Sequence, residues 1–218
     1  MKVLQKFIEE HRHFLYLLIF VPLLLIFYLC QKFISPKYIM YCRYDDYIPF
    51  LSVFIIPYMF WFAYIGIGFV YFGLKSKSDF IKLVKFIFWG MGVSYAAFIV
   101  FPSGQNLRPI LTDKGIFSAL VGFIYSIDPP ANVCPSIHVI NSIGVNAVVC
   151  KSELFQDRRI IKVISSIIMI LICASTLFIK QHSIIDVMAG IGLSIVLYFF
   201  IYVIPRVRQH EYDRKITN

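Results

Sequence analysis

The stretch Lys180-Gln181-His182-Ser183-Ile184-Ile185-Asp186 is a charged, titratable segment between two apolar runs, at residues 163–179 and 184–204. Each run is close to the roughly 20 apolar residues that a helix needs to cross a bilayer. An ionisable side chain costs roughly 2.5–3.5 kcal/mol at the centre of a membrane helix, so such groups are kept where water, partners or substrate satisfy them. The stretch therefore predicts two membrane helices joined by a functional polar connection.

The composition of the whole chain indicates a membrane protein. Of the 218 residues, 59% are hydrophobic, 17% are aromatic and only 15% are charged. An ordinary soluble domain carries more charge than this. Three further apolar runs have about the length of a membrane span: residues 14–33, 50–72 and 86–101.

Two weaker apolar segments complete the predicted topology. Residues 135–150 contain Asn141, Ser142 and Asn146, so we expect a sixth span that packs against other helices rather than against lipid. Residues 116–127 are apolar but too short to cross a bilayer, and we expect a re-entrant or interfacial helix there. The predicted fold is therefore all-α: a polytopic membrane protein with a six-transmembrane-helix bundle and one short re-entrant or interfacial helix.

Lysine and arginine residues are unevenly distributed along this topology. Most of the 21 lie before the first span, in the second and fourth connections, and after the last span. Cytoplasmic loops carry such an excess, so we expect both termini in the cytoplasm. Residues 1–205 then form one membrane domain, and residues 206–218 form a basic cytoplasmic tail. The short loops and small size favour a bacterial plasma membrane.

The net charge of +9 lies mostly on the predicted cytoplasmic rim, where anionic lipid headgroups attract it. No nucleic-acid partner is therefore expected. No oligomeric state follows from the sequence.

Two other polar clusters accompany the opening stretch: Pro135-Ser136-Ile137-His138 and Asn106-Leu107-Arg108-Pro109. In the predicted topology all three clusters fall in the third and fifth connections, on the face opposite the termini. Three polar clusters on one face of an apolar chain indicate one shared, outward-facing site.

The histidines of these clusters suggest proton transfer and nucleophilic chemistry. His182 and Asp186 are four residues apart, so they would share one face of a helix. A carboxylate bonded to one ring nitrogen fixes the tautomer and leaves the other nitrogen as a base or nucleophile. His138 can carry the opposite proton transfer, because an unperturbed imidazole titrates near neutral pH.

Positive charges and hydrogen-bond donors lie close to these histidines in the sequence. Arg108 and Lys180 supply charge and Ser136 supplies a donor, a set that suits phosphoryl transfer. Each also has a structural interpretation: Ser136 could cap the next span, Arg108 could lie in a solvated turn, and Lys180 could extend toward headgroups. For Asp45 and Asp46, in the first outer loop, a solvated turn is favoured over contact with an acceptor or headgroup.

The order and spacing of these residues resemble the type 2 phosphatidic acid phosphatase superfamily of integral membrane phosphatases and phosphotransferases. That family reads Lys-x6-Arg-Pro, then Pro-Ser-Gly-His, then Ser-Arg-x5-His-x3-Asp. The resemblance covers about residues 101–190, and the matching residues are Arg108-Pro109, Pro135-Ser136, His138, Ser175, His182 and Asp186. It implies a six-helix bundle with an outward-facing site, no metal and no cofactor.

The match departs from the family at three positions. Phe101 stands where the family has its opening lysine, Ile137 replaces a glycine, and Thr176 replaces an arginine. Two cations of the phosphate cradle are thereby missing, and Lys180 could restore charge from another direction. These losses favour a divergent branch of the superfamily, including one that transfers a phospho-headgroup as inositol phosphorylceramide synthases do.

The resemblance also implies roles for the matching residues. His182 would be the nucleophile that forms a phosphohistidine, and Asp186 would orient it. His138 would protonate the leaving alcohol, and Arg108 with Ser136 would hold the phosphate.

The expected function is metal-independent hydrolysis of a phosphate ester or pyrophosphate of a lipid, such as a phospholipid or a polyprenyl phosphate. Headgroup transfer is the alternative, with Asn106 and Ser175 as further candidates for contact with the headgroup or acceptor. A transporter or binding protein that uses the histidines as a proton relay is a third interpretation. Cys42 and Cys134 would share the outer side, where free thiols are favoured over a disulfide.

Overall fold

The computed structural model describes residues 9–113 and 115–207, and these residues are almost entirely helical. Five helices among them are long and apolar enough to cross a membrane: Arg12–Phe33, Ser52–Lys75, Lys77–Val100, Arg159–Phe178 and Ile184–Val207. The chain is therefore an integral membrane protein. The predicted basic tail lies outside the described residues, apart from Arg206 and Val207.

The elements follow one another in a simple order. They are η1 (Arg12–Ile19), α2 (Phe20–Phe33), β1 (Tyr38–Ile39), η2 (Arg43–Tyr47), η3 (Ser52–Phe54), α3 (Ile55–Lys75), α4 (Lys77–Val100), β2 (Ser103–Gly104), α5 (Ile116–Ile127), α6 (Ile137–Lys151), η4 (Glu153–Phe155), α7 (Arg159–Phe178), α8 (Ile184–Tyr198) and the π-helical turn η5 (Phe199–Val203).

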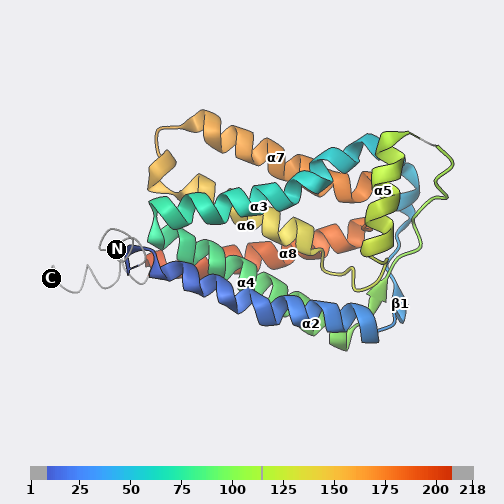
Figure 1. Cartoon of the computed structure of the whole chain (residues 1–218), viewed down its shortest axis with the longest axis horizontal. Coiled ribbons are helices and arrows are strands. Elements are labelled where there is room, and N and C mark those ends of the chain that lie inside the picture. Colours follow the sequence, from blue (N-terminus) through green and yellow to red (C-terminus); the bar gives the residue numbers. More distant parts are fainter. Residues whose placement is uncertain (1–8, 114, 208–218) are drawn as a thin grey trace.

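The helices α2, α3, α4, α6, α7 and α8 run lengthwise as a bundle (Figure 1). The short helix α5 lies across one end of the bundle, the end at which the β1 strand also lies (Figure 1). The start of the first helix and the end of α8 lie together at the opposite end. The molecule thus has two distinct ends, which we call the α5 end and the terminal end.

Helix α6 occupies the centre of the bundle and packs against α3, α4, α7 and α8. Val139, Asn141 and Ser142 on this helix are each no more than 2% exposed. This packing confirms the prediction that the polar segment 135–150 lies against other helices. With 15 residues, α6 is about 22 Å long, shorter than a hydrocarbon core of about 30 Å.

Helix α4 begins at Lys77, nine residues before the apolar run that predicted it. Ser76 caps it by accepting a hydrogen bond from the Asp79 backbone N–H at 3.3 Å. The sequence-based boundary was wrong because Lys82 and Lys85 were assigned to a connection, whereas they lie on the first turns of the helix. The predicted α5 segment, by contrast, has the boundaries of the apolar run, at Ile116–Ile127.

The two-residue strands β1 and β2 tie the first loop to the third at the α5 end. They pair in parallel, with Tyr38 opposite Ser103 and Ile39 opposite Gly104. Gly104 is required there, since a Cβ would lie 2.7 Å from the Pro36 side chain and 2.9 Å from the Pro130 carbonyl oxygen. Apart from these short strands, the described part of the chain is all-α.

Candidate active site

A mostly apolar cavity of about 290 Å³ lies at the α5 end of the bundle. Side chains of α2, α3, α4 and α5 form its apolar wall, among them Phe27, Tyr58, Trp61 and Tyr95. Its polar lining includes Asp128, His138, Gln181 and His182. We call it the histidine cavity.

His182 and Asp186 meet at the edge of this cavity. The Nδ1 atom of His182 lies 3.3 Å from Oδ2 of Asp186, and the two side chains are 9% and 0% exposed. The same carboxylate oxygen accepts the Ser183 backbone N–H at 2.9 Å. Asp186 thereby holds both the imidazole and the first turn of α8, and its contact with Nδ1 leaves the other ring nitrogen of His182, Nε2, uninvolved.

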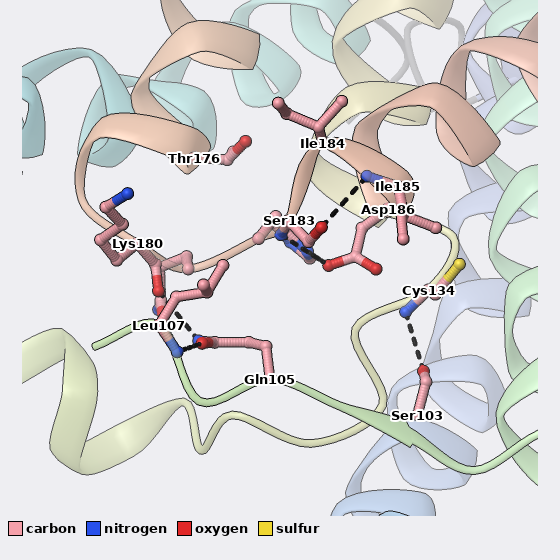
Figure 2. A network of polar contacts seen from close by, with 12 residues as sticks. Ser103, Gln105, Leu107, Cys134, Thr176, Lys180, Ser183, Ile184, Ile185 and Asp186 are labelled. Atoms are coloured by element: carbon pink, nitrogen blue, oxygen red, sulfur yellow. Dashed lines mark hydrogen bonds and ion pairs between the residues drawn. The ribbon is translucent and has the colours of Figure 1, made fainter. Parts of the chain in front are cut away.

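The reason for this contact differs from the one predicted. His182 lies outside α8, because Ser183 is the N-cap of that helix and Asp186 is its N3 residue in a capping box. Figure 2 shows Asp186 turning back toward Ser183. The pair therefore forms through capping geometry and not through a shared helix face.

His138 is the second residue of α6 and faces His182 across the cavity. The centroids of the two rings are 5.7 Å apart, with the planes at 63°. On its other sides, the His138 ring packs on the rings of Tyr58 and Trp61, with distances between ring centroids of 4.7 and 4.4 Å. The aromatic contacts fix the orientation of this imidazole beside that of His182.

Ser136 precedes α6 and is fully buried. Its backbone N–H donates to the Asp186 carbonyl oxygen at 3.1 Å, which joins the start of α6 to the start of α8. Although Ser136 is the N-cap residue, its side chain makes no cap hydrogen bond, and its Oγ has no partner among the described residues. The capping hydrogen bond that the sequence suggested for this hydroxyl is therefore not observed.

Arg108 reaches back toward the cavity from the third connection. It donates to the carbonyl oxygens of Tyr125 and Asp128, at 3.2 and 2.6 Å, and to Oε1 of Gln181. Its guanidinium lies over the Tyr125 ring, 4.3 Å from the centroid. The predicted solvated turn is thus not observed, since Arg108 is half-buried and held by the walls of the site.

Burial lowers the pKa of Arg108 from its ordinary value, and the Asp128 carboxylate opposes that shift. The group still carries its positive charge at neutral pH. Its Nε is buried and has no partner among the described residues, so this N–H group is a donor that the described contacts leave unsatisfied.

Asp128 and Gln181 are functional candidates that the sequence did not reveal. The Asp128 carboxylate accepts from the Tyr58 hydroxyl at 3.1 Å and from Nε2 of Gln181 at 3.2 Å. Burial raises the pKa of Asp128, while the Tyr58 hydrogen bond and the Arg108 charge, as well as His182 whenever it is protonated, oppose this rise. The only sequence signal for Asp128 was its place before Pro129-Pro130, which does not indicate a site.

A second pocket, of about 530 Å³, lies among the loops at the same end, and we call it the loop pocket. Its lining includes Asp45, Asp46, Asn106 and Lys180, but neither histidine. Lys180 Nζ donates to the Asp45 carbonyl oxygen at 2.8 Å, and burial lowers the pKa of Lys180 against the opposing pull of Asp45 and Asp46. Lys180 thus faces the loop pocket, although His182 lies only two residues away.

A backbone-centred network holds this turn in place. The Gln105 side chain donates from Nε2 to the Lys180 carbonyl oxygen at 2.9 Å, as Figure 2 shows. Gln105 is only 1% exposed, so it braces the third connection against the turn that carries His182.

Asp45 is the other anchor of the turn, and it is 1% exposed rather than solvated. Its Oδ2 accepts from the Ser183 hydroxyl at 2.7 Å and from the Cys42 backbone N–H at 2.8 Å. Its Oδ1 accepts from the Ile184 backbone N–H at 2.9 Å. Asp46 is exposed and accepts from the Tyr41 hydroxyl at 2.6 Å.

Three other motif positions, Phe101, Ser175 and Thr176, line neither cavity, whereas Ile137 lines the histidine cavity. Ser175 is fully buried and donates to the Ile172 carbonyl oxygen in its own helix, and Thr176 likewise donates to Cys173. The ring of Phe101 stacks on Tyr38, 4.1 Å between centroids. No cation replaces the family's lysine or arginine at these places.

The cysteines form no disulfide bond, and the acidic and imidazole side chains form no metal-binding cluster among the described residues. All five cysteines, Cys42 and Cys134 included, are free thiols. Burial, followed by the nearby Asp186, raises the pKa of Cys134 to about 12. Within residues 9–113 and 115–207 there is no group of three or more His, Cys, Asp or Glu side chains placed to hold a metal ion.

No family model, no curated protein and no solved structure matches this chain.

Proposed function

We propose that this chain is a divergent member of the type 2 phosphatidic acid phosphatase superfamily and that it hydrolyses a phosphate ester or pyrophosphate of a lipid without a metal. The observation that carries the proposal is the contact of His182 with Asp186 at 3.3 Å, beside the ring of His138 and on the edge of an apolar cavity. An apolar wall with a few convergent polar groups is what a lipid phosphate requires.

In the first step, Nε2 of His182 attacks phosphorus and the bond from phosphorus to the ester oxygen breaks. Asp186 keeps the Nδ1 proton of His182 in place and stabilises the positive charge that develops on the ring. His138 donates its proton to the leaving alkoxide, which departs as the lipid alcohol.

In the second step, neutral His138 takes a proton from water, and the resulting hydroxide attacks the phosphohistidine. The bond from phosphorus to nitrogen breaks, inorganic phosphate leaves, and both histidines regain their initial states. This cycle needs no further reactant.

We assign the phosphate to two groups. The buried Ser136 Oγ has no partner among the described residues and can donate to a phosphate oxygen. The Arg108 guanidinium, which donates to the Gln181 side chain in the cavity lining, supplies positive charge close to the cavity. Lys180 lines the loop pocket, and the hypothesis that it restores the family's missing charge predicts a loss of phosphate turnover in Lys180→Gln.

The six-helix count and the orientation belong to the same proposal. Although α6 is short, it is surrounded by other helices and needs no match to the full thickness of the lipid. With α6 as the sixth span, both termini lie in the cytoplasm and the α5 end faces outward, in accordance with the excess of lysine and arginine at the terminal end. A bacterial plasma membrane remains the proposed location.

Headgroup transfer is the second candidate, and the loop pocket favours it. This pocket lies beside the turn 180–183 and is lined by charged and amide side chains, Asp46, Asn106 and Lys180 among them. Such a lining can hold the polar headgroup of an acceptor lipid, whose hydroxyl would replace water in the second step. The transporter interpretation has less support, because both histidines of the proposed relay, His138 and His182, line one cavity at the α5 end instead of being spread along a path through the bilayer.

Phosphate release by the purified protein tests the proposal. We would assay phosphatidic acid, phosphatidylglycerol phosphate and polyprenyl pyrophosphate with chelator present, and compare His182→Ala and His138→Ala with His11→Ala at the terminal end. We expect release from at least one lipid, a loss of about a thousandfold or more in both site variants, and little change in His11→Ala.

Product analysis with an added lipid alcohol separates the two candidates. A new phospholipid formed at the expense of free phosphate would establish transfer. Full turnover in both site variants, or no consumption of any phospholipid with and without an acceptor, would refute the enzymatic proposal.

A further inference from the structure

A long groove lies on the side of the bundle between α4 and α8, away from the histidine cavity. Its volume is about 710 Å³, and residues from Ser78 to Val93 of α4 and from Leu193 to Pro205 of the last helix line it. The two helices contact each other along this side. We call it the lateral groove.

The groove starts at the terminal end and runs toward the middle of the bundle. Residues 78 and 93 are fifteen positions apart on α4, which corresponds to about 22 Å along the helix axis. One leaflet contributes about half of a hydrocarbon core of about 30 Å. An acyl chain that enters from the terminal end can therefore lie in the groove over the full depth of one leaflet.

The walls of the groove are apolar and open to the surrounding lipid. Trp89 and Phe200 are 56% and 62% exposed, and Ile201 lies beside them. Phe200 and Ile201 belong to the π-helical turn η5 that interrupts the end of α8. Such turns occur often at functional sites in helices.

Two lysines lie at the terminal end of the groove, one helical turn apart. Lys82 is 38% exposed at its side chain and pairs with Asp79 at 3.2 Å. Lys85 is exposed and makes no hydrogen bond or ion pair with any described residue. The groove thus has an apolar body and a positively charged mouth with one uncommitted cation.

The charges also decide between possible occupants. A second copy of the chain, docked symmetrically, would bring Lys82 and Lys85 close to the same residues of its partner. Anionic headgroups, in contrast, are attracted to basic pockets between membrane helices. We propose that the lateral groove binds a phospholipid of the adjacent leaflet that carries an anionic headgroup, with its phosphate at Lys82 and Lys85 and one acyl chain along Trp89.

The two tryptophans of the chain make a direct test possible. Trp61 lies in the histidine cavity, so Trp61→Phe leaves Trp89 as the only indole fluorophore. In vesicles of phosphatidylcholine we would titrate phosphatidylglycerol or phosphatidylcholine with brominated acyl chains and record the quenching of Trp89. We expect half-maximal quenching at an about fivefold lower mole fraction of the anionic lipid, the effect of one net lysine near the surface.

Charge variants supply the matched comparison. The pair Lys82→Gln and Lys85→Gln should remove the preference for the anionic lipid, whereas Lys75→Gln and Lys77→Gln, at the same end but outside the groove, should keep it. The single variant Lys85→Gln, at an exposed position, provides the same comparison if the double variant does not fold.

Equal quenching by the two brominated lipids would overturn the proposal. So would equal loss of preference in the two pairs of variants, because the effect would then come from surface charge alone. Protection of Trp89 from both lipids together with self-association of the protein would show that a second copy covers the groove.

Discussion

Replacement of Asp45 by asparagine should lower both the thermal stability of the protein and its catalytic rate, although Asp45 contacts neither His138 nor His182. Its carboxylate accepts three hydrogen bonds, from Cys42, Ser183 and Ile184. Two of these donors belong to the start of α8, directly after His182. Asp45 therefore fixes the turn that presents His182 to the cavity and places a negative charge at a helix N-terminus.

The size of the effect follows from the geometry. An asparagine side chain can keep its oxygen at the Oδ2 position, where it accepts from Cys42 and Ser183. Its amide nitrogen then faces the Ile184 backbone N–H, so that donor loses its partner. One charge-assisted hydrogen bond is worth about 1.5–3 kcal/mol, and the favourable charge at the helix start adds about 0.3–1 kcal/mol. We expect Asp45→Asn to cost about 2–4 kcal/mol, which corresponds to roughly 5–15 °C in Tm for a chain of this size.

Asp46→Asn is the matched control, since it removes the same charge from the adjacent residue. Asp46 is exposed and accepts only the Tyr41 hydroxyl bond among the described contacts, so its loss should change Tm by less than about 2 °C. Thermal unfolding in detergent would be measured for both variants, together with kcat for phosphate release. A displaced His182 should lower kcat about tenfold or more in Asp45→Asn.

The thermal comparison does not depend on the proposed activity. Equal Tm values for Asp45→Asn and Asp46→Asn would refute the role of Asp45 as an anchor of α8. A lower Tm with unchanged kcat would show that the turn keeps His182 in place without Asp45.

Three further predictions concern the site and its supports. Because burial raises the pKa of Asp128, this group gains its proton at a higher pH than an ordinary carboxyl group, and KM for a lipid phosphate should fall as the pH decreases through that range. The variant Asp128→Asn is always neutral and should show a flat KM profile. Parallel KM profiles of the two proteins would contradict this prediction. Gly190→Ala should lower Tm by a few degrees and kcat several-fold, because its Cβ would lie 3.0 Å from the Ser136 carbonyl oxygen. Gly192→Ala, whose Cβ would have nothing within 4 Å, should leave Tm unchanged or raise it. A larger loss of Tm in Gly192→Ala than in Gly190→Ala would be inconsistent with the packing of α6 on α8. Lys180→Gln should raise KM for a lipid-alcohol acceptor by tenfold or more and change kcat/KM for the phosphate donor by less than threefold. A hundredfold loss of kcat/KM for the donor would instead show that Lys180 acts on the phosphate.

The sequence predicted the long helices because membrane spans are determined largely by the length of apolar runs. The same criterion failed at the start of α4, where Lys82 and Lys85 interrupt the apolar run but remain in the helix. Lysine side chains at a helix end reach the headgroup region, so charge marks the depth of a residue in the membrane and not the end of the helix.

The histidines could be found from the sequence because each lies in a short polar segment next to an apolar run. Asp128 and Asp45 could not be assigned their places in this way. Asp45 bonds to Ser183 and Ile184, which are 138 and 139 residues away in the chain, and no local pattern predicts contacts over such a separation. The placement of the two carboxylates depends on how the loops pack at the α5 end.

The charge of the histidine cavity bears on which phosphate it accepts. Neither Phe101 nor Thr176 supplies the cation expected from the family pattern, and the residues found to line the cavity include Asp128 but no lysine or arginine. A lipid phosphomonoester carries about −1.5 to −2 charges at neutral pH, whereas a phosphodiester carries about −1. The doubly charged group would meet the Asp128 carboxylate with Arg108 as the permanent positive charge nearby, so protonation of Asp128 should matter most for monoesters. A steep fall of KM toward acid pH with monoesters and a shallow one with diesters would therefore locate the effect in this cavity, and equal slopes would place it elsewhere.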